Sequence, residues 1–224
     1  MKKLILVILI ITLSCKNEKK DSVEKTIETQ TFSLREKIAN AHGFEKWKHV
    51  SKIAFTFNVD KDNSHFERSW TWKPKTNDVI LISEKDTISY NRKSVDSISL
   101  NADKGFINDK FWLLASFQLV WDKGTSISEP RLEEAPISKQ KLNKITLTYS
   151  SDGGYTPGDA YDFYYSDDYL IKEWIYRKEN APEPSLITTW ENYQDFNGIK
   201  IGLNHIKLEG HWKLYFTNVN VEFN

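Results

Sequence analysis

Few residues of this chain have the types and spacing that catalysis or metal binding requires. His205 and His211 share the parity of one strand pattern, and Asp159 and Asp162 lie nearby, so four side chains of zinc-binding type occur in one region. Histidines six positions apart, with Gly210 between them at an expected turn, are more typical of ordinary polar positions. The sequence also lacks a Gly-x-Ser-x-Gly elbow, a glycine-rich phosphate loop, a His-Glu-x-x-His helix and paired cysteines. We therefore expect no catalytic residue, no bound metal and no cofactor.

The residue with the clearest chemistry is Cys15, the only cysteine of the chain. Lysines at positions 2 and 3 precede an unbroken apolar run over 4–11 and then small residues, which is the order of parts in a secretory signal peptide. That run is too short to span a bilayer as a helix, which takes about 20 apolar residues. Residues 1–14 are therefore predicted to be a removable signal peptide. The alternative is a signal peptide cut nearby, with Cys15 left as a free thiol.

Residues 12–15, Thr-Leu-Ser-Cys, resemble the lipobox of bacterial lipoproteins, in which the cysteine is lipidated and becomes the mature N-terminus. The resemblance implies that Cys15 carries a lipid through which the protein is held at a membrane. Residues 16–31 are highly charged and contain no aromatic residue, so they cannot bury enough apolar surface to offset their ordering entropy. We expect residues 15–31 to be a lipidated cysteine with a flexible tether, and the protein to be an outer membrane lipoprotein of the cell envelope.

The charge balance argues against nucleic acid as a partner. The whole chain has 31 basic and 31 acidic residues, and removal of Lys2 and Lys3 with the signal peptide leaves 29 against 31. Binding to phosphate backbones draws on a concentrated basic face, which this balance does not provide. With its one cysteine bound to lipid, the folded part has no disulfide, so its stability must come from a core.

Aromatic residues are the strongest sign of a binding site. The chain contains twelve Phe, ten Tyr and eight Trp, which is more aromatic bulk than a compact sandwich needs. A cavity walled by aromatic rings would use the surplus, whereas ordinary strand packing is the alternative reading. The expected cavity residues, chosen by strand parity and ring size, are Phe55, Phe57, Trp70, Trp72, Phe117, Tyr161, Phe163 and Trp174.

These side chains must be positioned by strands, because apolar residues alternate with polar ones over most of the chain after Ser51. We count about eleven antiparallel strands, with residues 32–224 forming a single β-rich domain. One of these strands is expected over 95–101 and another over 185–195. Residues 125–140 contain two prolines, lack any period and are predicted to be a surface loop.

Two helices are expected beside the strands. Ser33 and Glu36 have the spacing of a capping box, in which each side chain satisfies a free backbone donor at a helix start. A short turn with Phe44 and Trp47 should follow and pack back on the sheet. The segment Phe106–Trp121 is apolar over most of its helical circumference, so it must be buried. We expect it to be a central lid or plug.

The last strand changes its apolar phase. Trp212, Leu214 and Phe216 have even numbers, while the apolar residues from Val219 to Phe223 have odd ones. Because a slip of one residue reverses every side chain, a regular strand would put one trio in water. The sequence therefore predicts a β-bulge or break near residues 217 and 218.

A lipobox, an N-terminal helix, a long antiparallel meander and a mostly apolar central helix together resemble the Lol-type lipoprotein carriers and receptors. The segment Ala41-His42-Gly43 with Trp47, and the hairpin over 190–198, are similar to an uncharacterised family of Gram-negative lipoproteins. The resemblance implies a curved antiparallel half-barrel, with helices as a lid over an apolar cavity that takes acyl chains.

These observations together favour a membrane-anchored protein that binds an apolar or amphipathic ligand, such as a lipid or acyl chain, without covalent chemistry. An alternative is a surface module whose rings form an exposed patch that recruits a protein or glycan. A hydrolase with scattered catalytic residues is the third reading. An aromatic pocket of several hundred Å³ favours the first, a flat exposed apolar patch the second, and converging acid, base and nucleophile the third.

Overall fold

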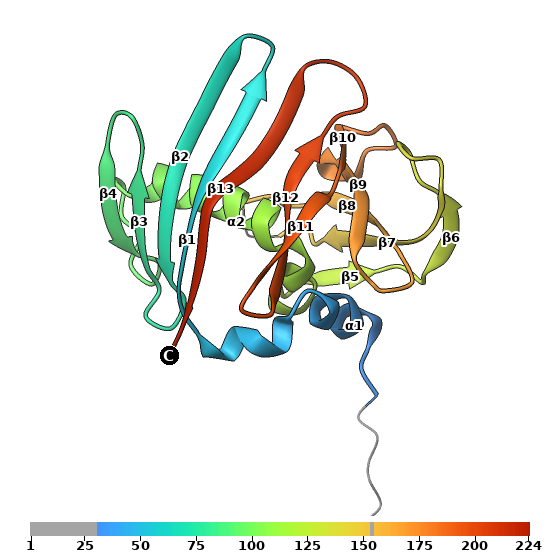
Figure 1. Cartoon of the computed structure of the whole chain (residues 1–224), viewed down its shortest axis with the longest axis horizontal. Helices are drawn as coiled ribbons and strands as arrows, with labels where there is room; N and C mark the ends of the chain where they lie inside the picture. The colour runs from blue at the N-terminus through green and yellow to red at the C-terminus, as the bar shows by residue number, and fades with distance from the viewer. Residues whose placement is uncertain (1–30, 153–154) are drawn as a thin grey trace, which may run out of the picture. The chain divides into compact units, whose positions relative to one another are not determined.

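The computed structural model describes residues 31–152 and 155–224, coloured from blue to red in Figure 1. The predicted signal peptide over 1–14, the lipidation residue Cys15 and all but the last residue of the predicted tether over 15–31 lie outside the described residues. The contacts of the remaining chain group Phe32–Asn224 into one unit, and the description below concerns that unit.

Most of this unit consists of strands, which form two antiparallel sheets that are not closed into a barrel. The larger sheet has seven strands (Figure 1). In spatial order they are β11 (Glu191–Phe196), β12 (Ile199–Ile206), β13 (Trp212–Phe223), β1 (Val50–Lys61), β2 (Ser64–Lys73), β3 (Asp78–Ile82) and β4 (Thr87–Asn91). The smaller sheet has the order β10 (Leu186–Thr189), β9 (Ile171–Arg177), β8 (Ala160–Tyr165), β7 (Lys141–Tyr149) and β5 (Thr125–Ile127), and β6 (Arg131–Glu134) also pairs with β7. The prediction of a mainly β, open antiparallel fold is confirmed.

One bent stretch of chain joins the two sheets. β10 ends at Thr189 on the edge of the smaller sheet, and β11 begins at Glu191 on the edge of the larger one. Between them, the Trp190 backbone N–H donates to the Lys172 carbonyl at 2.7 Å. The Ile206 N–H donates to Thr189 Oγ1 at 3.1 Å, which ties the same bend to β12. The strand predicted over 185–195 is therefore two strands, because its halves belong to different sheets.

The described residues contain thirteen strands where about eleven were expected. The strand predicted over 95–101 is wrong, since these residues form turns and the start of a helix. The carboxylate of Asp96 accepts hydrogen bonds from the backbone of Ile98 and Ser99, at 3.1 and 2.8 Å, and such local bonds compete with strand formation. The surface loop predicted over 125–140 instead contains β5 and β6, because one edge of β7 is open to pair with both.

The phase change in β13 is resolved by a bulge, as predicted. The pairing of β13 with β1 passes from Asn220 opposite Ala54 to Thr217 opposite Thr56, so β13 holds one extra residue there. Asn218 takes up the extra residue with a φ of 52°. The apolar residues on both sides of the bulge pack into or against the same core.

The N-terminal helix α1 (Leu34–Ala41) begins with the predicted capping box. The Ser33 Oγ accepts from the Glu36 N–H at 3.4 Å, and the Glu36 carboxylate accepts from the Ser33 N–H at 2.8 Å. A 3₁₀ turn, η1 (Phe44–His49), follows and packs Trp47 on Trp72 of β2, with ring centres 5.4 Å apart. A second short 3₁₀ turn, η2 (Lys178–Asn180), follows β9.

Helix α2 (Leu100–Trp121) lies behind β1 and β13 in Figure 1 and touches both sheets. Its Phe106 packs on Trp70 of β2, with ring centres 5.4 Å apart, and its Phe111 packs on Tyr161 of β8 at 4.6 Å. The backbone leaves helical geometry at Leu114. Side chains are buried around most of its circumference, as the sequence predicted. Among the described residues, no helix has both the length and the apolar content needed to cross a membrane.

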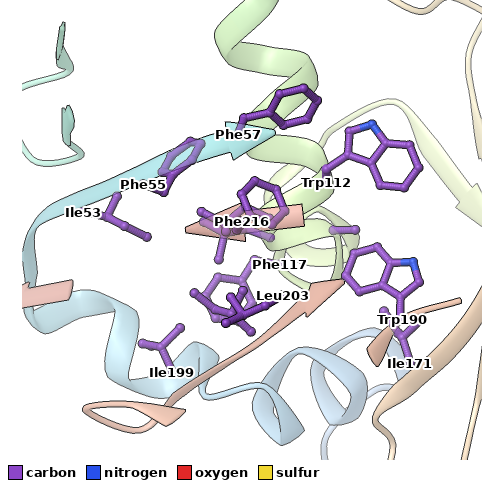
Figure 2. Close-up of a cluster of buried hydrophobic side chains, with 14 of the residues drawn as sticks. Ile53, Phe55, Phe57, Trp112, Phe117, Ile171, Trp190, Ile199, Leu203 and Phe216 are labelled. Atoms are coloured by element: carbon purple, nitrogen blue, oxygen red, sulfur yellow. The ribbon is translucent and has the colours of Figure 1, made fainter. Parts of the chain in front are cut away.

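The main core lies between α2 and the larger sheet. Figure 2 shows Phe55 and Phe57 of β1 and Phe216 of β13 directed toward Trp112 and Phe117 of α2. The Phe216 ring lies 5.8 Å from that of Phe55 and 5.9 Å from that of Phe57. Aromatic residues of this size bury roughly 150–250 Å² each, so this cluster supplies much of the stability of the fold.

Candidate ligand pocket

A pocket of about 670 Å³ opens between the two sheets along one side of α2. Strands β1 and β13 form one wall with Phe57, Val59, Trp212 and Leu214. The smaller sheet forms the opposite wall with Tyr161, Trp174, Tyr176 and Leu186. Helix α2 contributes Lys104, Ile107, Asn108, Phe111 and Trp112, and the loop after residue 154 contributes Tyr155 and Thr156. Most of this lining is apolar, and eight of the fifteen residues are aromatic.

The helix and the smaller sheet hold the aromatic wall in place by ring contacts. Trp174 has its ring centre 4.3 Å from that of Trp112 and 5.8 Å from that of Phe111. Tyr161 stacks on Trp174 at 5.3 Å and on Tyr176 at 5.1 Å. Such tilted and stacked pairs fix ring orientation, so the wall is largely formed before any ligand arrives.

The tyrosines of this wall are neutral at physiological pH. Burial raises the pKa of Tyr161 well above its usual value, and burial with the hydrogen bond to Asp159 raises that of Tyr176 to about 12. The Tyr176 hydroxyl donates to Asp159 Oδ2 at 2.9 Å. The wall can therefore offer apolar surface and hydroxyl dipoles without introducing a negative charge.

The structure brings three of the eight predicted cavity residues to this pocket: Phe57, Tyr161 and Trp174. The other five lie in the core and do not line it: Phe55, Trp70, Trp72, Phe117 and Phe163. Strand parity places a side chain on the inner face, but it does not say what covers that face. Trp72 illustrates this, because Phe106 of α2 and Trp47 of η1 both cover it, each with its ring centre 5.4 Å away.

The residues missed by sequence analysis come mainly from α2. Phe111 and Trp112 lie in the predicted helix but were not assigned to the cavity. A signal was present, because the polar residues Lys104 and Asn108 lie three positions before Ile107 and Phe111, respectively, and so share one side of the helix with them.

A smaller polar pocket of about 320 Å³ adjoins the apolar one, and Ile107, Phe111, Tyr155 and Thr156 border both. Its charged residues are Arg92, Lys110, Asp122, Lys123 and Asp152. Lys110 is only 8% exposed, and its ammonium group lies 5.5 Å from the ring centre of Trp121 and 5.9 Å from that of Trp72. Burial, with a further contribution from the nearby Arg92 charge, lowers the pKa of Lys110 to about 8.

The four residues considered as metal ligands are not brought together. His205 is buried beside Trp190, with ring centres 4.4 Å apart, whereas His211 is exposed in the turn before β13. Asp159 accepts from Tyr176 and from the Glu179 N–H, and Asp162 pairs with Arg177 at 3.1 Å. Among the described residues, no three His, Cys, Asp or Glu side chains are grouped so that they could hold a metal ion.

Comparison with protein-family models gives no match, and comparison with curated proteins gives none. Among solved structures, the chain is similar to a DUF1329 family protein from Desulfovibrio piger, with a TM-score of 0.45 and 9% identity over 86% of this chain and 94% of that one. It is also similar to a domain named for outer membrane lipoprotein sorting, from Vibrio parahaemolyticus, with a TM-score of 0.44 and 8% identity over 84% of this chain and 93% of that one. Similarities of this size carry no argument about the ligand or activity of this chain.

Proposed function

We propose that this protein is a membrane-anchored lipoprotein that binds an apolar or amphipathic ligand, such as a lipid or acyl chain, without covalent chemistry. The observation that supports the proposal is the pocket of about 670 Å³ between the two sheets. Its volume falls in the range of small-molecule sites, and its lining is mostly aromatic and aliphatic with a few polar groups at one side.

The placement of exposed apolar residues supports this function over a surface module. Ile80 and Ile82 point away from the core on β3, while Phe66 lies toward the far end of β2. A few exposed apolar residues of this kind are normal on soluble proteins.

Contact quenching of tryptophan fluorescence by a brominated fatty acid tests the proposal, since Trp112, Trp174 and Trp212 border the pocket. The protein for this experiment is the mature chain from residue 15 with Cys15→Ala, so that no attached lipid competes. We expect saturable quenching, and we expect Ile107→Glu to weaken it at least tenfold by placing a charge in the lining. Ile82→Glu makes the same change on the outer face of β3, where Ile82 is 52% exposed, and should leave quenching unchanged. No saturable quenching, or equal loss in both variants, would contradict the proposed function.

The anchor is tested separately in cells. We expect the unaltered chain to fractionate with membranes and to lack a free thiol, because Cys15 is the only cysteine. Cys15→Ala should move the protein to a soluble or unprocessed fraction. A mature N-terminus at another position, with Cys15 still titratable as a thiol, would contradict the lipid anchor.

A further inference from the structure

The polar pocket beside the apolar one is lined by three cations, Arg92, Lys110 and Lys123. Lys110 of α2 and Arg92, which follows β4, both line it. Burial and then the Arg92 charge lower the pKa of Lys110, whereas the charges of Asp122 and Asp103 raise it. Like charges directed into a shared cavity are unfavourable unless an anion lies between them.

Two of the carboxylates nearby, Asp103 and Asp122, are already engaged by other groups. Asp103 accepts from Arg92 Nε at 2.8 Å and also from Tyr155 at 2.9 Å. Asp122 accepts from the Tyr149 hydroxyl. No carboxylate in the described part of the chain forms an ion pair with Lys110.

Lys110 has one neutral polar partner. With the Gln118 amide turned so that its nitrogen faces Asp122 at 2.9 Å, its oxygen accepts from Lys110 Nζ at 3.1 Å. An ammonium group has three donors, so this contact leaves donor capacity toward the pocket. The terminal nitrogens of Arg92 likewise make no hydrogen bond within the described residues, since only its Nε is engaged. A buried, desolvated cation with free donors makes strong hydrogen bonds to anions.

We propose that Lys110 and Arg92 bind the acidic headgroup of an amphiphile whose chain occupies the adjoining apolar pocket. This inference rests on the proposed function and names the class of ligand: a carboxylate or phosphate group joined to an acyl or alkyl chain. Ile107 and Phe111 border both pockets, so a headgroup beside Lys110 and a chain along Trp112 and Trp174 can belong to one molecule.

The test compares four probes on the mature chain with Cys15→Ala, by titration calorimetry at pH 7: dodecanoate, dodecyl phosphate, dodecanol and inorganic phosphate. The first three share one chain and differ in the head, and the fourth has no chain. We expect the two acidic amphiphiles to bind about tenfold or more tightly than dodecanol, the effect of one charge-assisted hydrogen bond. Inorganic phosphate should bind far more weakly than dodecyl phosphate.

Lys110→Met removes the charge while keeping an unbranched side chain of similar length over the two tryptophans, so the fold should tolerate it. We expect it to weaken binding of both acidic probes about tenfold and to leave dodecanol binding unchanged. Lys85→Met is the matched control, because Lys85 is exposed in the turn between β3 and β4 and lines neither pocket. It should alter none of the affinities.

Three outcomes would overturn the inference. Equal binding of dodecanol and dodecanoate, with no effect of Lys110→Met, would leave a pocket for chains without an anion site. Inorganic phosphate binding as tightly as dodecyl phosphate would indicate an anion site that does not use the chain. Failure of all three amphiphiles to bind would overturn the proposed function as well. Equal binding of dodecanol and dodecanoate would overturn only the inference about the acidic headgroup.

Discussion

Arg68 of β2 donates two parallel hydrogen bonds to the Asp109 carboxylate of α2, from Nε to Oδ2 at 2.6 Å and from Nη2 to Oδ1 at 2.7 Å. Trp70 Nε1 donates to the same carboxylate at 2.7 Å. Asp109 is fully buried, so these donors replace the water that its charge would otherwise need. The pair fastens the middle of the helix to the larger sheet, and thereby positions the helix side that forms the pocket.

Asp109→Asn should lower the free energy of unfolding by roughly 3 kcal/mol, because it leaves the Arg68 charge largely buried without its partner. Denaturant unfolding of the variant and the parent measures the difference. Glu222→Gln is the control, since it breaks the exposed Lys52–Glu222 pair and should cost less than about 1 kcal/mol. Equal costs for the two variants would contradict a stabilising role of the buried pair.

Phe117→Ala should destabilise the protein by about 3–5 kcal/mol without changing ligand binding. Phe117 is 1% exposed, and its ring lies 5.3 Å from Phe44 and 5.6 Å from Trp47, away from the pocket lining. The exposed Phe66 provides the control, and Phe66→Ala should cost roughly 1 kcal/mol or less. Unchanged stability would mean that α2 is peripheral. Tighter binding of a fatty-acid probe would mean that the space left by the Phe117 ring is connected to the pocket.

Gly43→Ala should be far more damaging than Gly210→Ala. Both glycines have positive φ, of 90° and 80°, so alanine is strained at each by about 1–2 kcal/mol. A Cβ on Gly43 would also lie 1.9 Å from the Gly198 carbonyl oxygen, whereas a Cβ on Gly210 meets nothing within 4 Å. The difference in unfolding free energy between the two variants therefore measures the cost of the steric clash where η1 closely approaches the turn between β11 and β12. Equal losses would mean that this approach is dispensable.

Stability should fall as the pH is lowered from about 6.5 to 5. Burial lowers the pKa of His42 to about 4 and that of His205 to about 3, whereas both are near 6.5 in the unfolded chain. In this window the unfolded state binds protons that the folded state does not, so each histidine contributes a slope of up to about 1.4 kcal/mol per pH unit. The contribution is fully present above about pH 7.

His205→Phe removes one of the two titrating groups from an aromatic cluster, so the slope measured by denaturant unfolding should fall by about half. An unchanged slope, or stability that rises on acidification through this window, would contradict the assignment of these histidines as buried and neutral. The pH series must stop near 5, because carboxylates begin to titrate below that value.

Local features of the fold could be predicted from the sequence because their causes are local. The capping box needs only Ser33 and Glu36 at the right spacing. The bulge at Asn218 follows from the phase of apolar residues along one strand, since a regular ladder would expose half of them. The burial of α2 follows from apolar residues around its circumference.

The sequence predictions were wrong where the backbone N–H and C=O groups of a segment have two possible sets of hydrogen-bond partners. A strand was predicted over 95–101, but the Asp96 carboxylate binds the backbone locally and holds a turn instead. Residues 125–140 carry loop composition, yet β7 pairs with two short parts of them. In both cases the outcome depends on which hydrogen-bond partners are available in space, and spacing along the chain does not contain that information.

The sequence by itself determined which residues are apolar, which face of a strand or helix they occupy, and where a lipid anchor is expected. Only the tertiary structure decided that Trp70 and Phe117 are covered while Phe57, Tyr161 and Trp174 border a pocket. It also placed Lys110 of α2 and Arg92, which follows β4, in the lining of one polar pocket. Periodicity assigns a direction to each side chain, but a cavity is space that packing leaves unfilled, and that depends on how elements distant in sequence meet.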